Sequence, residues 1–470
     1  MTSRTPIIPQ NLKLLVEERI HDDGLRGNIR RATHTSLGKR AAVVEDFPRW
    51  EEMRTTAHDI KKHVMDNLAH YLELFERQAT EAGAQVHFAR DAKEASSIVC
   101  GLAREHGERV IVKSKSMATE EIHLNPALQQ SGLRVLETDL GEYIVQLAEE
   151  PPSHITAPAL HKSRGEIGRL FSEQLGIPYT DDPEELTAIA RRVLREEFLQ
   201  ADVGISGVNF GLAESGTICI VENEGNARLS TTLPKVHIAV MGIEKLLPDA
   251  ESLGLFLNML GRSATGQRIT CYTSLITGPK RSTEPDGPEQ LHIVLLDNGR
   301  STMHADPKLR EALYCIRCGA CMNICPVYQK VGGHGYGSVY SGPIGSVVTP
   351  VFMGEQAAHD LPFASSLCGA CADICPVRID IHHHLLDWRH RMVEGQDGPL
   401  LERIAMRLFT FTALSALRFD LAGRLARLFA PFLKHSAGGM RLPVWSETRE
   451  FPNLPEKSFK QLWKEDRERS

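Results

Sequence analysis

Residues 315–326, Cys315-Ile-Arg-Cys318-Gly-Ala-Cys321-Met-Asn-Ile-Cys325-Pro326, decide the fold of their part of this 470-residue chain. The spacing C-x2-C-x2-C-x3-C-P is typical of chains that hold two cubane iron–sulfur clusters. Three thiolates two residues apart can wrap one face of a cube, while the fourth points toward a second cube. Gly319 lets the backbone approach inorganic sulfide, and Pro326 prevents a straight continuation of the helix.

A second stretch, Cys368-Gly-Ala-Cys371-Ala-Asp-Ile-Cys375-Pro376, repeats the last three cysteines of the pattern. Ser365 stands where its first cysteine would be. In the crossed ligation of bacterial ferredoxins, the fourth cysteine of each motif binds the other cluster. The predicted ligands are Cys315, Cys318, Cys321 and Cys375 for cluster 1, and Cys325, Cys368 and Cys371 for cluster 2. Cluster 2 therefore lacks one thiolate.

Three possibilities are open for that gap. Cluster 2 is a three-iron cluster, or a four-iron cluster with Ser365, water or another group on the unique iron, or a residue from elsewhere supplies the ligand. We favour a four-iron cluster with one non-cysteine site. C-x2-C pairs also hold zinc, but a second C-x3-C-P repeat argues for iron–sulfur clusters.

Composition agrees with a globular protein in a reducing compartment. Hydrophobic residues make up 42% and charged residues 24% of the chain, and the net charge of -6 gives no reason to expect nucleic acid as a partner. Residues 1–10 lack the pattern of a signal peptide, and no apolar run has the ~18 residues of a membrane span, so we expect the cytoplasm. Seven of the ten cysteines cluster; Cys100, Cys219 and Cys271 are interpreted as small buried hydrophobes.

Strand-like and helix-like runs alternate before the cysteines, which predicts an α/β domain with a mainly parallel sheet. The predicted strands are Gln85–Ala89, Val110–Lys113, Arg134–Glu137, Gly216–Glu222, Val236–Met241, Ile269–Ser274 and Leu291–Leu296. The predicted helices are His58–Ala82, Asp91–His106, Glu120–Gln130, Glu142–Leu147, Ser163–Leu175, Asp182–Gln200 and Gly242–Leu247.

Four regions follow from this pattern. Residues 1–60 are predicted to be a polar, irregular extension with a helix near Leu12–Ile20. Residues 61–300 form the α/β domain, residues 305–393 form an α-helical ferredoxin-type domain with two clusters, and residues 394–470 form a helical C-terminal region. The glycines of residues 331–345 predict a tight loop over the clusters rather than a phosphate site, since no Lys-Ser/Thr pair or preceding strand accompanies them.

No catalytic residue can be assigned, but two stretches of the α/β domain are candidates. Lys113 and Lys115 follow a strand and could meet a small anion, or they could be solvated loop residues. The glycine-rich residues 204–217 include Glu214 and could form a ligand site at a sheet edge, or merely a set of tight turns. The run His382–His384 is interpreted as surface and helix-start residues rather than as metal ligands.

These motifs together resemble the lactate utilisation protein B family. The resemblance rests on VKSKSM, GVNFGLAESGT, VENEGNARLSTTLPKVHI, CIRCGACMNICPVY, GGHGYGSVYSGPIGSVVTP and SLCGACADICPV, in that order. It implies a LUD domain similar in fold to sugar-phosphate isomerases and CoA transferases, and two [4Fe-4S] clusters on the seven cysteines predicted above. It also implies that the missing eighth cysteine is a family trait.

The resemblance further implies a function and partners. The chain would be the electron-transfer subunit of a system that oxidises L-lactate to pyruvate and permits growth on lactate. Its partners would be a cysteine-rich subunit and a small LUD-domain subunit; the electron acceptor is not indicated, and no flavin or nicotinamide fingerprint is visible.

Other hypotheses stay open. The α/β domain could itself transform a small anion, or the chain could serve another 2-hydroxy-acid or glycerol-phosphate dehydrogenase. The apolar residues 408–417, with Arg418, Arg424 and Arg427, could dock partners or a membrane surface; we favour their packing against the protein itself.

Overall fold

The computed structural model describes residues 12–106, 110–395, 400–429 and 455–469, and its chain divides into two units, Met1–Arg391 and Met392–Ser470. The strands are β1 (Gln85–Ala89), β2 (Val110–Lys113), β3 (Val135–Glu137), β4 (Ala201–Gly207), β5 (Phe210–Leu212), β6 (Thr217–Glu222), β7 (Val236–Gly242), β8 (Leu246–Leu247), β9 (Tyr272–Ile276) and β10 (Gln290–Leu296).

The helices of the α/β domain and of the segment before it are α1 (Leu12–Ile20), α2 (Asp23–Glu45), α3 (Trp50–Asp66), α4 (Leu68–Glu81), α5 (Ala92–His106), α6 (Met117–Glu121), α7 (Leu124–Gln130), α8 (Leu140–Leu147), α9 (Arg164–Leu175), α10 (Pro183–Gln200), α11 (Asn226–Thr232), α12 (Ala250–Thr265) and the short η1 (Ile243–Lys245). Those that follow are α13 (Arg300–Ala305), η2 (Arg310–Tyr314), α14 (Ala320–Ile324), α15 (Tyr328–Val331), η3 (His334–Tyr336), α16 (Gly342–Met353), η4 (Leu361–Phe363), α17 (Ala370–Ile374), α18 (Ile381–Glu394), α19 (Leu400–Ala413), α20 (Ala416–Phe429) and α21 (Phe459–Arg469).

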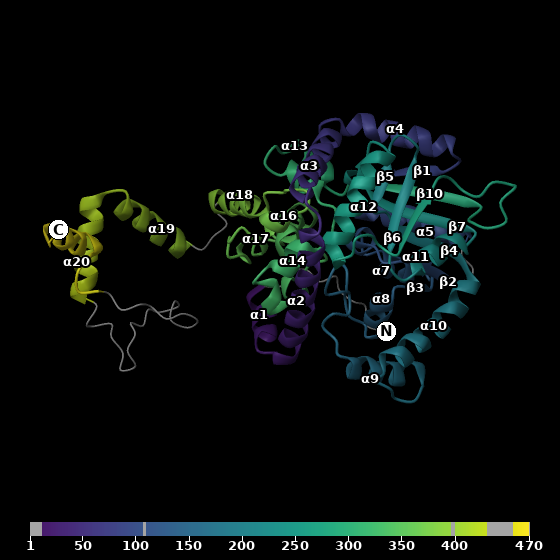
Figure 1. Cartoon of the computed structure of the whole chain (residues 1–470), viewed down its shortest axis with the longest axis horizontal. Helices are drawn as coiled ribbons and strands as arrows, with labels where there is room; N and C mark the ends of the chain where they lie inside the picture. Colours follow the sequence, from purple (N-terminus) through teal and green to yellow (C-terminus); the bar gives the residue numbers. More distant parts are fainter. Residues whose placement is uncertain (1–11, 107–109, 396–399, 430–454, 470) are drawn as a thin grey trace. The chain divides into compact units, whose positions relative to one another are not determined.

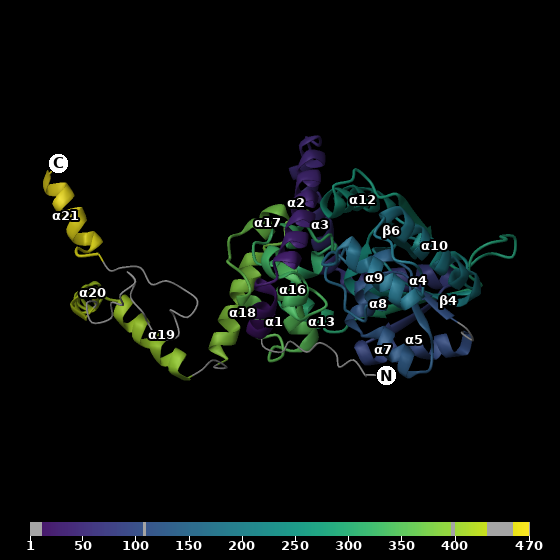
Figure 2. The ribbon, with the colours of Figure 1, turned by 90° about the horizontal axis from the view of Figure 1, so that it is seen from below.

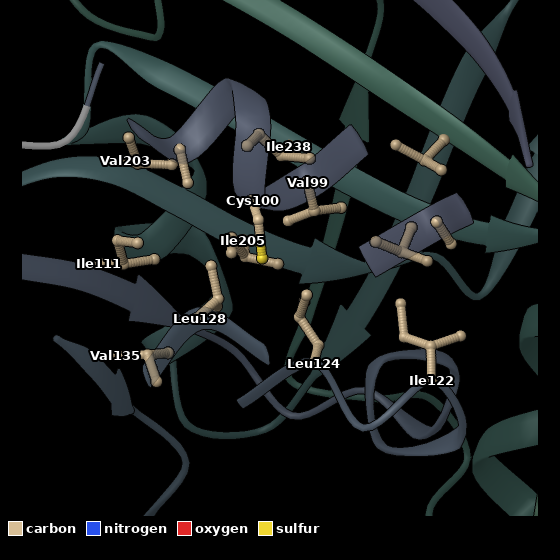
Figure 3. Close-up of a cluster of buried hydrophobic side chains, with 14 of the residues drawn as sticks. Val99, Cys100, Ile111, Ile122, Leu124, Leu128, Val135, Val203, Ile205 and Ile238 are labelled. Atoms are coloured by element: carbon tan, nitrogen blue, oxygen red, sulfur yellow. The ribbon is translucent and has the colours of Figure 1, made fainter. Parts of the chain in front are cut away.

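A six-stranded sheet is the centre of the α/β domain (Figure 1). Its strand order is β1-β10-β7-β4-β2-β3, and every pair is parallel, as predicted. Apolar side chains of β2, β4 and β7 pack against α5 and α7 on one face, where Val99, Leu128 and Ile205 meet (Figure 3). Burying each such side chain contributes about 1.5–3 kcal/mol.

The central strand β4 was missing from the predicted strands because its glycines suggested a turn. Gly204 has no room for a side chain: a Cβ atom there would lie 1.8 Å from the Ser230 carbonyl oxygen in α11. At Gly207 a Cβ would lie 2.5 Å from Ser116 Oγ. The glycines therefore serve close packing on a parallel strand, a tertiary requirement that local sequence does not reveal.

A second sheet, β8-β5-β6-β9, contains the hairpin β5–β6. The predicted helix Gly242–Leu247 is wrong, since that segment forms the short η1 and the two-residue strand β8. Its apolar residues are buried, but the run is too short to show helical periodicity. Cys271, which precedes β9, is exposed, whereas Cys100 and Cys219 are buried as expected.

The segment before the α/β domain is helical rather than irregular. Helix α2 contacts α12, α14 and α15, and α3 contacts α12 and η2, so both helices lie between the α/β domain and the cysteine region (Figures 1 and 2). The predicted helix His58–Ala82 is two helices, α3 and α4, separated at Asn67. Their buried faces meet partners far along the chain, which explains why a mostly polar sequence becomes helical here.

The C-terminal unit contains α19, α20 and α21. Apolar side chains of α19 and α20 are exposed in it, including Phe409 at 62% and Leu417 at 83%. The described helices of this unit leave these side chains uncovered, and the packing of residues 408–417 against the protein stays a prediction. No helix among the described residues combines the length and apolar character needed to cross a bilayer.

Candidate iron–sulfur centre

The two cysteine motifs share one backbone conformation. Arg317 and Leu367, at matching positions, both have left-handed backbones, with φ of 59° and 54°. Gly319 and Gly369 follow with φ of 76° and 82°. Each motif then continues into a five-residue helix, α14 or α17, that ends just before its last cysteine. Non-glycine residues rarely adopt positive φ, so the shared geometry is a structural repeat and not a coincidence of spacing.

The seven thiols gather as two sets. The first thiol set is Cys315, Cys318, Cys321 and Cys375, and the second thiol set is Cys325, Cys368 and Cys371. Burial raises the pKa of Cys318 to about 12, and the nearby thiol of Cys375 adds to the rise. Burial also raises the pKa of Cys371 to about 12, here with Cys325 as the first neighbour. Each motif thus contributes its last cysteine to the other motif's set, because α14 and α17 pack together.

The thiols of each set are not gathered as tightly as the ligands of a single ion. Four thiolates around one zinc ion lie about 3.8 Å apart, given Zn–S bonds of about 2.3 Å. Among the described residues, two groups have three metal-ligating atoms within 4.8 Å of one another, and neither group contains a cysteine. Neither thiol set therefore has three sulfurs as close together as the ligands of one zinc ion in this structure.

Backbone N–H groups surround the sulfurs. The N–H of Arg317 donates to Cys315 Sγ at 3.4 Å, and that of Ile379 donates to Cys375 Sγ at 3.4 Å. Ile344, in the glycine-rich segment, donates to Cys321, so this segment covers the thiols as predicted. Such dipoles stabilise sulfur that carries negative charge, and the donor set fits iron–sulfur clusters.

Tyr336 lies between the two thiol sets. Its side chain is 1% exposed, and its hydroxyl has no oxygen or nitrogen partner among the described residues. Burial raises the pKa of Tyr336, and Cys325 and Cys321 both contribute. The phenol is therefore placed to donate a hydrogen bond to cluster sulfur.

The two thiol sets differ in exposure. In the first set, Cys318, Cys321 and Cys375 are at most 8% exposed, and Cys315 is half-buried. In the second set, Cys368 is exposed, and the N–H of Ala370 lowers its pKa. The second set is thus the one nearer solvent.

Two cations approach the first thiol set, the buried Lys61 of α3 and the half-buried Lys245 of η1. Burial lowers the pKa of Lys61 to about 7 and that of Lys245 to about 8, and Cys315 acts on both in the opposite direction. Lys61 also donates to the backbone oxygen of Glu244. Neither lysine was predicted from sequence, although the spacing of Ala57, Lys61 and Val64 places Lys61 on the apolar face of its helix.

An ion network joins the α/β domain to the cysteine region. Arg300 donates two hydrogen bonds to Glu121, at 2.8 and 2.9 Å, and one to Glu244 at 2.5 Å. Tyr340 donates to Glu121 at 2.6 Å, and Arg317 lies 3.7 Å from Glu244. Burial alone would raise the pKa of Glu244, but Arg300 holds it at about 2. The network places the C-terminal edge of the parallel sheet against the first thiol set.

The candidate anion-binding residues of the α/β domain do not form one site. Lys113 is fully buried, 2.7 Å from Glu137 and 3.3 Å from Glu120, so its charge is already neutralised. Lys115 is 27% exposed and lies 3.0 Å from Asp139. Glu214 is exposed on the β5–β6 turn, in the second sheet.

The three consecutive histidines begin α18 as interpreted from sequence, but the surface position is wrong for His384. His382 and His383 lie within 3.1 Å and 2.6 Å of Asp380. His384 is buried and lies 2.8 Å from Glu311. Their partners are carboxylates that hold the start of this helix.

Three family models match successive parts of the chain: the LUD domain over residues 72–296, the 4Fe-4S dicluster domain over residues 311–379, and the C-terminal domain of lactate utilisation protein B over residues 389–468. The dicluster match and the buried thiols together show that the chain binds [4Fe-4S] clusters.

Similar proteins extend over nearly the whole chain. "Lactate utilization protein B" of Bacillus subtilis is 44% identical, covering 97% of this chain and 96% of its own length. The protein of the same name from Bacillus licheniformis is 43% identical, covering 97% of both chains, and that from Anoxybacillus flavithermus is 44% identical, covering 96% and 97%. The chain therefore belongs to the lactate utilisation protein B family.

Proposed function

We propose that this protein is the electron-transfer subunit of a complex that oxidises L-lactate to pyruvate in the cytoplasm and permits growth on lactate. Its partners would be a cysteine-rich subunit and a small LUD-domain subunit. The proposal draws on the names of the relatives and on the buried contact between the sheet edge and the first thiol set.

In this proposal the first thiol set holds cluster 1 and the second thiol set holds cluster 2. Each cluster, when bound, takes up and releases single electrons. The N–H donors and the cations Lys61, Lys245 and Arg317 offset the negative charge near Cys315. The exposure of Cys368 supports an order in which electrons enter at cluster 1, beside the α/β domain, and leave at cluster 2.

The exposure of Cys368 carries this proposal, because a relay needs a cluster that its electron acceptor can approach. The test is Cys318→Ser in a system reconstituted from the three proteins. Lactate-dependent reduction of an acceptor should fall at least tenfold, since cluster 1 loses a ligand. Cys271→Ser, an exposed cysteine outside both thiol sets, is the matched control. Equal rates in the two variants would refute the relay.

A second candidate function is turnover of a small anion by the α/β domain itself. Lys115 favours it: this partly exposed cation follows β2 and also donates to the Thr156 carbonyl at 3.4 Å, and ligands bind at the carboxyl ends of parallel strands. Incubating the purified single chain with lactate and an artificial acceptor separates the two functions. Turnover that Lys115→Met abolishes would favour the self-contained enzyme, and no turnover without partners would favour the subunit.

A further inference from the structure

The second cysteine motif contains an oxygen where the first contains a sulfur. Cys315 Sγ accepts a hydrogen bond from the N–H two residues later, at 3.4 Å. Ser365 Oγ accepts the equivalent bond from Leu367, at 3.1 Å. Since Arg317 and Leu367 share the left-handed conformation, the repeat carries the Ser365 hydroxyl to the place in the second motif that Cys315 Sγ occupies in the first.

The backbone at Ser365 is fixed from outside the motif. Arg389, in α18, donates to the Ser365 carbonyl at 2.7 Å and to the Pro362 carbonyl at 2.9 Å. Its guanidinium also lies 5.3 Å from the centre of the Phe363 ring. These contacts hold the loop before Leu367 in a single conformation, as a ligand position requires.

Other polar side chains near the second thiol set already have roles. The Ser366 hydroxyl bonds to Cys368 and helps to lower the pKa of that thiol. Tyr336 is next to Cys325 but also acts on Cys321 of the first thiol set, which suits a hydrogen-bond donor between clusters. His382 pairs with Asp380 through Nδ1, at 3.1 Å, and its Nε2 is the competing ligand that the Ser365→Ala spectra below test.

We propose that the Ser365 Oγ is the fourth ligand of cluster 2, so that one iron is held by oxygen and three by cysteine sulfur. This inference rests on the assignment of cluster 2 to the second thiol set. Forming the Fe–O bond releases the hydroxyl proton to solvent and changes no oxidation state. Ser365 is half-buried, so solvent can accept the proton.

An oxygen ligand makes this iron different from the other three. Thiolate is the softer donor and suits iron–sulfur clusters better, so the oxygen-bound iron is the one most readily lost or exchanged. The Ser365 hydroxyl retains that iron. Removing the hydroxyl leaves a site with three thiolates, which suits a three-iron cluster.

The test uses the full-length protein, purified anaerobically with isotopically enriched iron, and reads Mössbauer and EPR spectra together with the iron content. The wild type should show one iron subsite that differs from the rest. Ser365→Cys should abolish this difference and keep the iron content. Ser365→Ala should lose one iron of cluster 2 on mild oxidation and give the EPR signal of a three-iron cluster.

Ser215→Ala, an exposed serine of the α/β domain outside both cysteine motifs, is the matched control and should keep the distinct subsite. Wild-type spectra from Ser365→Ala would overturn the proposal, because water or another residue would then hold the iron. A three-iron signal in the wild type that resists added ferrous iron would overturn it too. Cys368→Ala tests separately whether cluster 2 is held by the second thiol set. Loss of the distinct iron subsite in this variant supports that assignment, and an unchanged subsite overturns the assignment. None of these readings depends on lactate.

Discussion

Replacing Arg300 with Met tests whether the buried ion network stabilises the fold. The side chain of Arg300 is 1% exposed, and those of Glu121 and Glu244 are 3% and 2% exposed. After the substitution Glu244 still has Arg317 at 3.7 Å. Among the described residues, Glu121 is then left with neutral donors such as the Tyr340 hydroxyl at 2.6 Å. Removing one partner of a buried pair costs about 3–5 kcal/mol, because the other charge is left uncompensated.

That cost can be converted to a melting temperature. Unfolding entropy is about 2.1 cal/mol/K per residue, which for the unit Met1–Arg391 amounts to about 0.8 kcal/mol/K. We therefore expect Arg300→Met to lower Tm by about 4–6 °C, measured by circular dichroism on the anaerobic protein.

Two further variants make the test specific. Adding Glu121→Gln to Arg300→Met should recover part of the loss, because no unpaired carboxylate is then buried. Arg268→Met removes an arginine from the exposed pair with Asp46 and should change the free energy of unfolding by no more than about 1 kcal/mol. A decrease below 1 °C for Arg300→Met, or one that the second substitution deepens, would refute the reasoning.

Three other substitutions give independent tests. Tyr336→Phe should make one cluster potential about 40 mV more negative in an EPR-monitored redox titration, since a hydrogen bond of about 1 kcal/mol to the Cys325 sulfur favours the reduced state; an unchanged potential would contradict this role. Burial alone would raise the pKa of Glu311, but hydrogen bonds, including one from His58, hold that pKa well below its usual range. Glu311 in turn raises the pKa of His58. In urea titrations at a series of pH values, Glu311→Gln should therefore lower the free energy of unfolding most at mildly acidic pH. The loss relative to wild type should shrink as pH rises through the raised pKa of His58 or falls through the lowered pKa of Glu311. A loss independent of pH would argue against the ion pair. Trp388→Ala should cost about 3–5 kcal/mol in the same titrations, because the indole is 2% exposed and donates to a carbonyl of α16; a loss below 1 kcal/mol would mean that the site collapses around the smaller side chain.

The cysteine motifs and most strands could be predicted because their signals are local. The spacing of Cys315 to Cys325 and the apolar runs of β1 and β2 contain the necessary information within a few residues. Strand β4 could not be predicted in this way, since the glycine at position 204 is required by the close approach of the Ser230 carbonyl in α11.

Long-range partners explain the residues that the sequence analysis missed. Lys61 has its acceptor at Glu244, 183 residues away, so its burial beside Cys315 appears only after folding. Likewise, the sequence shows that Ser365 stands where a cysteine is missing, but the position of its hydroxyl oxygen depends on the backbone conformation of Leu367.

The contact between the first helices and the second cysteine motif has a consequence for biosynthesis. Arg54, in α3, donates to the Cys375 carbonyl at 2.9 Å across 321 residues, and Arg40, in α2, donates to the Ile374 carbonyl at 3.0 Å. At about 5–20 residues per second, α3 leaves the ribosome roughly 16–64 s before its acceptors exist. During this interval the nascent chain exposes a helical surface whose partners are still untranslated. Cluster 1 can therefore be completed only after Cys375 has been translated, when the earliest and latest parts of the first unit come together.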